Sequence, residues 1–476
     1  MTSTNFRPAA RSAAAIALAI ALVAPLCAMA QTPPLSARIA GEEAQLSAPP
    51  APAEAALFPS LAAWQDQMES EGWLVRGQAT FVIQGHPSFR SPYRAAGSLR
   101  PAAQAANTFS SDLVLGRRLW AGAEVLVNAS VTRGFGLSNA TGIAAFPNNE
   151  AFRLGSTEPY IYTPRILFRQ TIGLSADTVP NDDPLRFNAP LPRERITITA
   201  GKMSVWDIFD DNRYAHDPRT QFLNWALVGG GAFDYAADAR GWTPGVAIEW
   251  ENGSWGLRAG AFQVARRVNG LFLDPAVTRA WQALAQVDRF YTVNGRSGAL
   301  RLTYGASRSR QSSWGEIFRN GFDTFEQNPT GYRLKHNVNL SWDQELTDDL
   351  GVFARLSWND GRTQNWMFTE MDRAVSGGLS LRGLRWNRPN DTVGLGANIG
   401  WISAGRRQYL EQGGIGFITG DGALRYRPEV ASEVYYDARV APGVNLAVNY
   451  QLAVNPAFNA DRGPVHLFAF RARLAF

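Results

Sequence analysis

Apolar and polar residues alternate along much of this chain, and the pattern is clearest in its final stretch, residues 466–476. Every second residue back from Phe476 is apolar, whereas Arg473 and Arg471 lie between these positions. A period of two places the two sets on opposite faces of one β-strand. An exposed apolar edge strand makes a soluble protein prone to aggregation, but a closed membrane barrel needs such strands because its backbone groups pair internally. The pattern therefore favours a membrane barrel.

The alternation begins at Trp73 and recurs in many later segments. In the first segment the apolar face carries Trp73, Val75, Ala79, Phe81 and Ile83, and the polar face carries Arg76, Gln78, Thr80 and Gln84. Comparable segments lie at 246–250, 255–261, 338–342, 352–358, 434–440 and 444–450. A single alternating segment also fits a soluble β-sandwich. Their repetition predicts an all-β fold, a transmembrane antiparallel β-barrel of about 16 strands at roughly ten residues per strand.

Turn residues divide the connections into two classes. Short turns are expected at Asn252-Gly253, at 347–351 and at 441–443, where Asn, Asp, Gly and Pro suit tight chain reversals. Long inserts are expected at 132–160, 265–295, 359–372 and 403–430, and the strand pattern is weakest between 205 and 240. In a membrane barrel the short turns are periplasmic, and the long inserts face outward or fold into the pore.

The N-terminus predicts export. Residues 1–30 combine Arg7 and Arg11, an apolar run over 12–26 and a small-residue cleavage site at Ala30, as in a secretory signal peptide. The run is too short for a membrane anchor. Residues 31–72 form an Ala/Pro-rich periplasmic segment with a possible short helix from Leu61 to Gly72, and 73–476 form the barrel. The only cysteine, Cys27, lies within the signal peptide, which excludes disulfides and thiol chemistry from the mature chain.

Composition excludes several function classes. The formal net charge is +5 at pH 7, so the chain lacks the basic excess of a nucleic-acid-binding protein. The sequence has four histidines and no Gly-x-Ser-x-Gly motif, which argues against an outer-membrane hydrolase. Glycine runs at 134–136 and 229–231 lack the strand–helix context of a nucleotide site. Residues 31–72 are too few for the plug of a receptor-type transporter. We expect neither an enzyme nor a cofactor.

Strand parity also predicts which polar side chains face the interior. A solute pathway for sugars should offer hydrogen-bond donors and acceptors and should bind weakly, so that the solute is released. Nearly all basic residues are arginines, whose planar groups bond well to oxygen ligands. The lumen candidates are Arg76, Gln78, Gln84, Asp112, Glu124, Arg165, Arg169, Glu249, Arg258, Arg301 and Arg355. A simpler interpretation is that most of these charges only solvate the lumen or pair with one another.

Several segments resemble the carbohydrate-selective porins of the OprB-like family. The strongest is 201–227, which reads GKMSVWDIFDDNRYAHDPRTQFLNWAL; further matches lie at 85–93, 146–151, 388–394 and in the closing strands. The resemblance implies a porin of 16 strands that passes monosaccharides and similar small solutes by diffusion across the outer membrane. We expect its outer wall to contact outer-membrane lipid, and the sequence is compatible with either a monomer or a homotrimer. The last strand, ending on Phe476, resembles the signal that outer-membrane proteins present to the barrel-assembly machinery.

The acidic segment within 201–227 permits three hypotheses. Its candidate residues are Asp207, Asp210, Asp211, Asn212, Tyr214 and Arg219. A calcium loop is disfavoured because the spacing departs from the EF-hand order. A structural role follows from the capping and turn propensity of Asp and Asn. A third hypothesis makes the segment a constriction that places Tyr214 and Arg219 near the solute. A general diffusion porin without sugar preference is the alternative function, because a fold does not determine what a pore selects.

Overall fold

The structure is a computed structural model that describes residues 57–150, 156–181, 183–322, 329 and 331–476. The expected signal peptide and most of the Ala/Pro-rich segment lie outside these residues. The chain divides into two compact units, and the one described below comprises Ala55–Tyr291 and Arg296–Phe476. No helix within the described part of the chain has the length and apolar character needed to span a bilayer.

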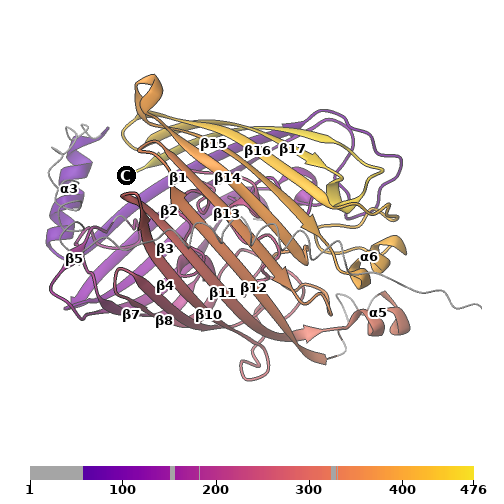
Figure 1. Cartoon of the computed structure of the whole chain (residues 1–476), viewed down its shortest axis with the longest axis horizontal. Helices are drawn as coiled ribbons and strands as arrows, with labels where there is room; N and C mark the ends of the chain where they lie inside the picture. Colours follow the sequence, from indigo (N-terminus) through magenta and orange to yellow (C-terminus); the bar gives the residue numbers. More distant parts are fainter. Residues whose placement is uncertain (1–56, 151–155, 182, 323–328, 330) are drawn as a thin grey trace, which may run out of the picture. The chain divides into compact units, whose positions relative to one another are not determined.

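A closed antiparallel β-barrel of 16 strands forms this unit, as the repeated alternation predicts (Figure 1). In chain order its first eight strands are β1 (Trp73–His86), β2 (Gln104–Trp120), β3 (Ala123–Gly134), β4 (Ser156–Gly173), β7 (Arg195–Met203), β8 (Thr243–Glu251), β9 (Trp255–Phe262) and β10 (Trp281–Val293). The other eight are β11 (Arg296–Gln311), β12 (Gly331–Glu345), β13 (Leu350–Asn359), β14 (Arg373–Gly383), β15 (Arg388–Trp401), β16 (Glu429–Ala441), β17 (Val444–Val454) and β18 (Val465–Ala475). Each strand pairs with its neighbours along the chain.

The first and last strands close the barrel. β1 and β18 pair antiparallel, with Gln78 opposite Ala475, and Gly77 and Phe476 exchange backbone hydrogen bonds of 2.8 and 2.9 Å. In β18, Phe468 is 56% exposed, whereas Arg471 is 1% exposed on the inner face. The predicted faces of the final strand are therefore confirmed, and closure leaves no free sheet edge.

The outer wall is largely apolar, and two tyrosine–histidine pairs on it satisfy one another. Tyr304 on β11 shares a hydrogen bond of 2.7 Å with Nδ1 of His336 on β12, and Tyr450 on β17 shares one of 2.8 Å with His466 on β18. A polar group facing hydrocarbon is costly unless it has a partner. The diagonal placement of each tyrosine and histidine across two paired strands supplies that partner.

The start of β1, the end of β18 and most of the short turns lie at one end of the barrel. Helix α3 (Pro59–Ser70) lies there beside β1, close to the helix expected over 61–72 (Figure 1). Gln65 donates to the Val75 carbonyl (2.8 Å), and Glu69 pairs with Arg76 (2.7 Å). These contacts hold α3 against the strand that follows it.

The connection from β4 to β7 is longer than the short turns expected at this end. It contains a two-stranded sheet of β5 (Thr178–Val179) and β6 (Leu191–Pro192). Phe187 is 5% exposed, and the Arg118 guanidinium lies over its ring, 4.3 Å from the ring centroid. The Leu185 carbonyl accepts a hydrogen bond from Arg169 (3.0 Å). The insert therefore packs into the barrel mouth, an arrangement that depends on distant residues and gives no local sequence pattern.

Most long connections lie at the opposite end, which carries α5 (Trp314–Asn320) and α6 (Ala404–Glu411) in Figure 1. Other short elements are η1 (Leu137–Asn139), η2 (Val205–Asp207), α4 (Trp225–Val228), η4 (Leu384–Trp386) and η5 (Pro456–Phe458). The expected insert at 265–295 was partly wrong, because β10 starts at Trp281. The outward residues Ala283 and Ala285 of β10 are small, so its alternation is weakly apolar and was missed.

Candidate functional site

Residues 204–242, between β7 and β8, form the segment that fills much of the lumen, and we call them the inserted segment. Local capping shapes its elements: Ser204 and Asp207 form a reciprocal capping box at η2, and the Asn224 side chain caps α4. Trp225 stacks on Phe146 with centroids 5.5 Å apart and is 1% exposed. The segment thus carries its own apolar core inside a polar barrel.

Polar side chains on the inner wall hold the backbone of the inserted segment. The Glu433 carboxylate on β16 accepts from the amides of Leu223 (2.9 Å) and Asn224 (2.8 Å). The Gln282 side chain on β10 accepts from the Ala236 amide at 2.6 Å. An irregular segment inside a protein leaves amides without regular partners, and each costs about 1–3 kcal/mol if unsatisfied. The inward polar residues therefore replace the secondary structure that the segment lacks.

Two arginines of the wall pair with the acidic part of the inserted segment. Arg355 on β13 contacts Asp210 at 2.9 Å and also donates to the carbonyls of Leu227 (2.8 Å) and Ala215 (2.6 Å). Arg165 on β4 forms a fork to both oxygens of Asp207, at 2.8 and 2.6 Å. Because arginines occupy both carboxylates, the structural role expected for these two aspartates is present, and this supports the preference against a calcium loop.

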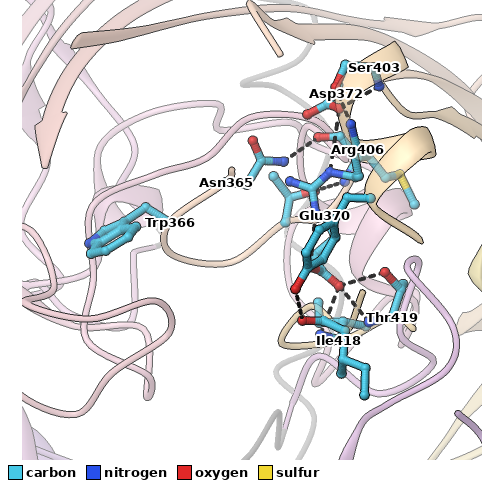
Figure 2. Close-up of polar contacts among 12 residues, drawn as sticks. Asn365, Trp366, Glu370, Asp372, Ser403, Arg406, Ile418 and Thr419 are labelled. Atoms are coloured by element: carbon cyan, nitrogen blue, oxygen red, sulfur yellow. Dashed lines mark hydrogen bonds and ion pairs between the residues drawn. The ribbon is translucent and has the colours of Figure 1, made fainter. Parts of the chain in front are cut away.

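A second buried network joins two other inserts, residues 360–372 and 402–428 (Figure 2). The Glu370 carboxylate accepts from Nη1 of Arg406 (3.0 Å), the amide of Ile418 (2.9 Å) and the amide and hydroxyl of Thr419 (2.5 and 2.9 Å). The Ser403 amide donates to Asp372 at 2.6 Å. Glu370 and Arg406 are 0% and 1% exposed, so this network fixes the inserts and is closed to solute.

A less crowded part of the lumen lies around Arg219. Its side chain is 27% exposed and spans two carboxylates, Asp112 on β2 at 2.7 Å and Glu150 at 2.8 Å. Asp211 and Arg213, elsewhere on the inserted segment, are also exposed. Burial alone would raise the pKa of Asp217, but Arg219 and Arg473 lower it overall, so this carboxylate stays charged. The region offers donors and acceptors whose charges nearly balance.

The other lumen candidates lie on the inner face of the wall, and most have partners there. Arg169 pairs with Glu124 (2.7 Å), Arg258 with Glu249 (3.2 Å) and Asp288 (2.9 Å), and Arg301 with Asp343. Gln78 donates to Asp112 (2.7 Å), and Gln84 donates to the Pro147 carbonyl (2.8 Å). Their contact with a passing solute stays a prediction, as does that of Arg76, Arg165 and Arg355.

The structure brings together most of the acidic-segment candidates but gives them different environments. Asn212 is buried and donates to Ser341 Oγ (3.1 Å), whereas Asp211 is exposed and Tyr214 is half-buried. Sequence reasoning missed Glu150, the second partner of Arg219, because Glu150 lies in a connection without strand parity. It also missed Asp343, although the parity of β12 places that residue inward with Asn337, Asn339 and Ser341.

The family follows from sequence comparison. The model of the carbohydrate-selective porin, OprB family, matches residues 96–476. The chain belongs to this family. Its members are porins, so the protein is an outer-membrane channel for carbohydrates rather than an enzyme. No curated protein matches the chain by sequence.

Solved structures agree with the OprB-family assignment at the level of fold. The high-pH structure of Pseudomonas putida OprB superposes with a TM-score of 0.67 and 16% identity, covering 89% of this chain and 99% of that one. The low-pH structure of the same protein superposes with a TM-score of 0.47 and 12% identity, covering 88% of this chain and 98% of that one. The outer membrane channel DcaP of Acinetobacter baumannii superposes with a TM-score of 0.46 and 11% identity, covering 85% of this chain and 96% of that one. The first of these supports the porin fold observed here.

The charge balance at Arg219 predicts a pH-dependent selectivity. Burial, only partly offset by Arg219, raises the pKa of Glu150 above its usual value. Glu150 therefore takes up a proton at a higher pH than an ordinary glutamate, and the loss of its negative charge makes the lumen more positive. We expect anion selectivity, measured as a reversal potential in planar bilayers, to rise as the pH falls from neutral to mildly acidic. Glu150→Gln should raise the anion selectivity at neutral pH and make it less dependent on pH. An unaltered pH dependence would contradict the role of Glu150 as the titrating group.

Proposed function

We propose that this OprB-family porin passes monosaccharides and similar small carbohydrates by passive diffusion through an Arg-rich lumen. The observation that carries the proposal is Arg219, a partly exposed guanidinium held between the carboxylates of Asp112 and Glu150. The carboxylates occupy Nη2 and Nε and fix the plane of the side chain. Its remaining donors are available to hydroxyl oxygens of a solute.

The charge pairing suits a neutral, hydroxyl-rich solute. Paired guanidinium and carboxylate groups supply donors and acceptors without a large net field, so neither cations nor anions are strongly concentrated. A sugar makes several weak hydrogen bonds with such groups and leaves again, as diffusion requires. The half-buried Tyr214 ring packs against Gly351 of β13, on another part of the inner wall, and offers an apolar surface for a sugar face there.

Liposome swelling tests the proposal. Liposomes containing the purified full mature chain should swell severalfold faster in glucose than in an amino acid of comparable size, and a disaccharide should enter more slowly than glucose. Empty liposomes control for leakage. Permeation that scales with solute size alone would overturn the sugar preference and favour the alternative of a general diffusion porin.

A further inference from the structure

Three arginines gather around Tyr332 on the outer wall of the barrel, and we call this group the Tyr332 cluster. Arg279 lies over the Tyr332 ring at 4.6 Å, and Arg308 lies over it at 5.8 Å. Arg310 is the direct cross-strand partner of Tyr332, on β11. Arg308 and Arg310 alternate with the buried Ser307, Ser309 and Gln311, so both face outward. Three positive charges therefore surround one aromatic ring on the membrane side.

The cluster carries an excess of positive charge. Within the part of the chain that the structure describes, no carboxylate lies within ion-pair distance of Arg279, Arg308 or Arg310. The nearest acidic partner of the cluster is Asp274, which is 3% exposed and accepts from the Tyr332 hydroxyl (3.0 Å) and the Ala276 amide (2.9 Å). This carboxylate holds the ring in place, and the outward guanidinium groups have no counter-ion among the described residues.

The register of β12 places the cluster at a membrane boundary. Trp342 lies on the same outward face as Tyr332, ten residues along the strand, and its Nε1 donates to the Tyr291 hydroxyl at 2.6 Å. Ten residues of a strand tilted by about 40° rise roughly 25 Å, the height of the apolar band of a membrane barrel. The two aromatic positions thus mark the two edges of this band, and Leu334 and Leu340 lie between them.

The outward residues of β11 change character in the same direction. Leu302 is 48% exposed, Tyr304 follows with its hydroxyl bound to His336, and Arg308 and Arg310 come last. The sequence of apolar, aromatic and cationic residues matches the change from hydrocarbon to head groups. The cluster lies at the end of the barrel opposite the α3 end, which is the outer-leaflet end if the short turns are periplasmic.

We propose that the Tyr332 cluster binds the phosphorylated head group of a glycolipid of the outer leaflet, with lipid A as the representative chemistry. Arginine forks match phosphate oxygens and bind them in charge-assisted pairs. Leu334 (47% exposed) is the cross-strand partner of Arg308, and Leu302 (48% exposed) lies six residues further into the apolar band on β11. Both suit acyl chains, which free phosphate lacks. The site is independent of which solute passes through the lumen.

Native mass spectrometry of the full mature chain in detergent, with purified lipid A as the probe, tests the proposal. Arg308→Gln/Arg310→Gln should weaken lipid A binding about thirtyfold, because each interfacial arginine contributes several-fold to the attraction of an anionic lipid. The matched control is Arg117→Gln/Arg289→Gln, which removes two outward arginines stacked on Trp73 (4.7 Å) and Trp255 (4.9 Å) at the opposite edge. The control should bind lipid A like the unaltered protein.

Each other outcome has a defined meaning. Unweakened binding by the double variant, or an equal loss in the control pair, would overturn the site. Displacement of lipid A by millimolar inorganic phosphate would assign the arginines to free phosphate and overturn the lipid assignment. Unchanged glucose swelling rates in liposomes without lipid A show that the double variant is folded, so loss of lipid A binding by a swelling-competent variant supports the proposal whatever solute the pore prefers.

Discussion

Arg355→Met is expected to cause a large loss of stability in this porin. The variant leaves Asp210, which is fully buried, without its counter-charge and removes donors from the carbonyls of Leu227 and Ala215. Breaking one partner of a buried ion pair costs about 3–5 kcal/mol. The temperature at which the barrel unfolds, measured from the shift in its electrophoretic mobility, should fall markedly. Single-channel recordings should become noisier, because Asp210 no longer fixes the inserted segment.

A double-variant cycle separates the ion pair from simple loss of packing. Asp210→Asn/Arg355→Met removes both charges, and asparagine tolerates the positive φ of 55° at this position. Replacing both members of a buried pair is often close to neutral, so the double variant should regain most of the lost stability. Arg385→Met is the matched control, since Arg385 is 62% exposed and pairs with Asp349 on a turn. A control as unstable as Arg355→Met would contradict the explanation.

Strand parity could be predicted because it is a local property. The faces of β1 and β18 follow from a period of two, and the barrel then requires polar residues such as Arg258 and Arg301 to face inward. Strands with small outward residues were harder, and β10, with Ala283 and Ala285 on its outer face, was missed for that reason. Sequence therefore predicted the wall better than the connections.

The contents of the lumen could not be predicted in the same way. Parity placed Arg355 inside, but it did not reveal that the inserted segment covers it and accepts a hydrogen bond from each of its three guanidinium nitrogens. Glu433 holds the amides of Leu223 and Asn224, more than two hundred positions earlier in the chain. Such pairs depend on how the connections fold back into the barrel, and the alternation of apolar and polar residues does not indicate how they do so. Burial by distant segments decides which inward charges can meet a solute.

Arg219 differs from Arg355 in this respect. Both arginines are paired with carboxylates, but Arg355 is 1% exposed and Arg219 is 27% exposed. The first therefore acts as an anchor, whereas the second can both position its neighbours and meet the solute. This contrast makes Arg219 the position at which selectivity and structure can be separated by experiment.

Arg219→Gln is expected to change selectivity more than stability. Burial raises the pKa of Glu150 even beside Arg219, so the recordings are made at mildly alkaline pH. There, loss of the guanidinium leaves the Asp112 and Glu150 carboxylates ionised and uncompensated at the lumen. A unit charge about 10 Å from a permeating ion contributes roughly 1–2 kcal/mol at an effective dielectric constant near 20, so cation-over-anion permeability should rise about tenfold. Glucose uptake by liposomes should fall severalfold, because the sugar loses a donor.

Arg407→Gln provides the matched control for this prediction. Arg407 is 51% exposed on α6 and pairs with Glu411 at 2.7 Å, so its replacement changes the total charge equally but leaves the region around Arg219 intact. Reversal potentials and glucose uptake of this variant should equal those of the unaltered protein. If Arg219→Gln also left both quantities unchanged, Arg219 would be a structural residue, and the solute would pass along another part of the lumen. Restoration of the original selectivity at the same mildly alkaline pH by Arg219→Gln/Glu150→Gln would confirm that charge balance at this position sets the preference.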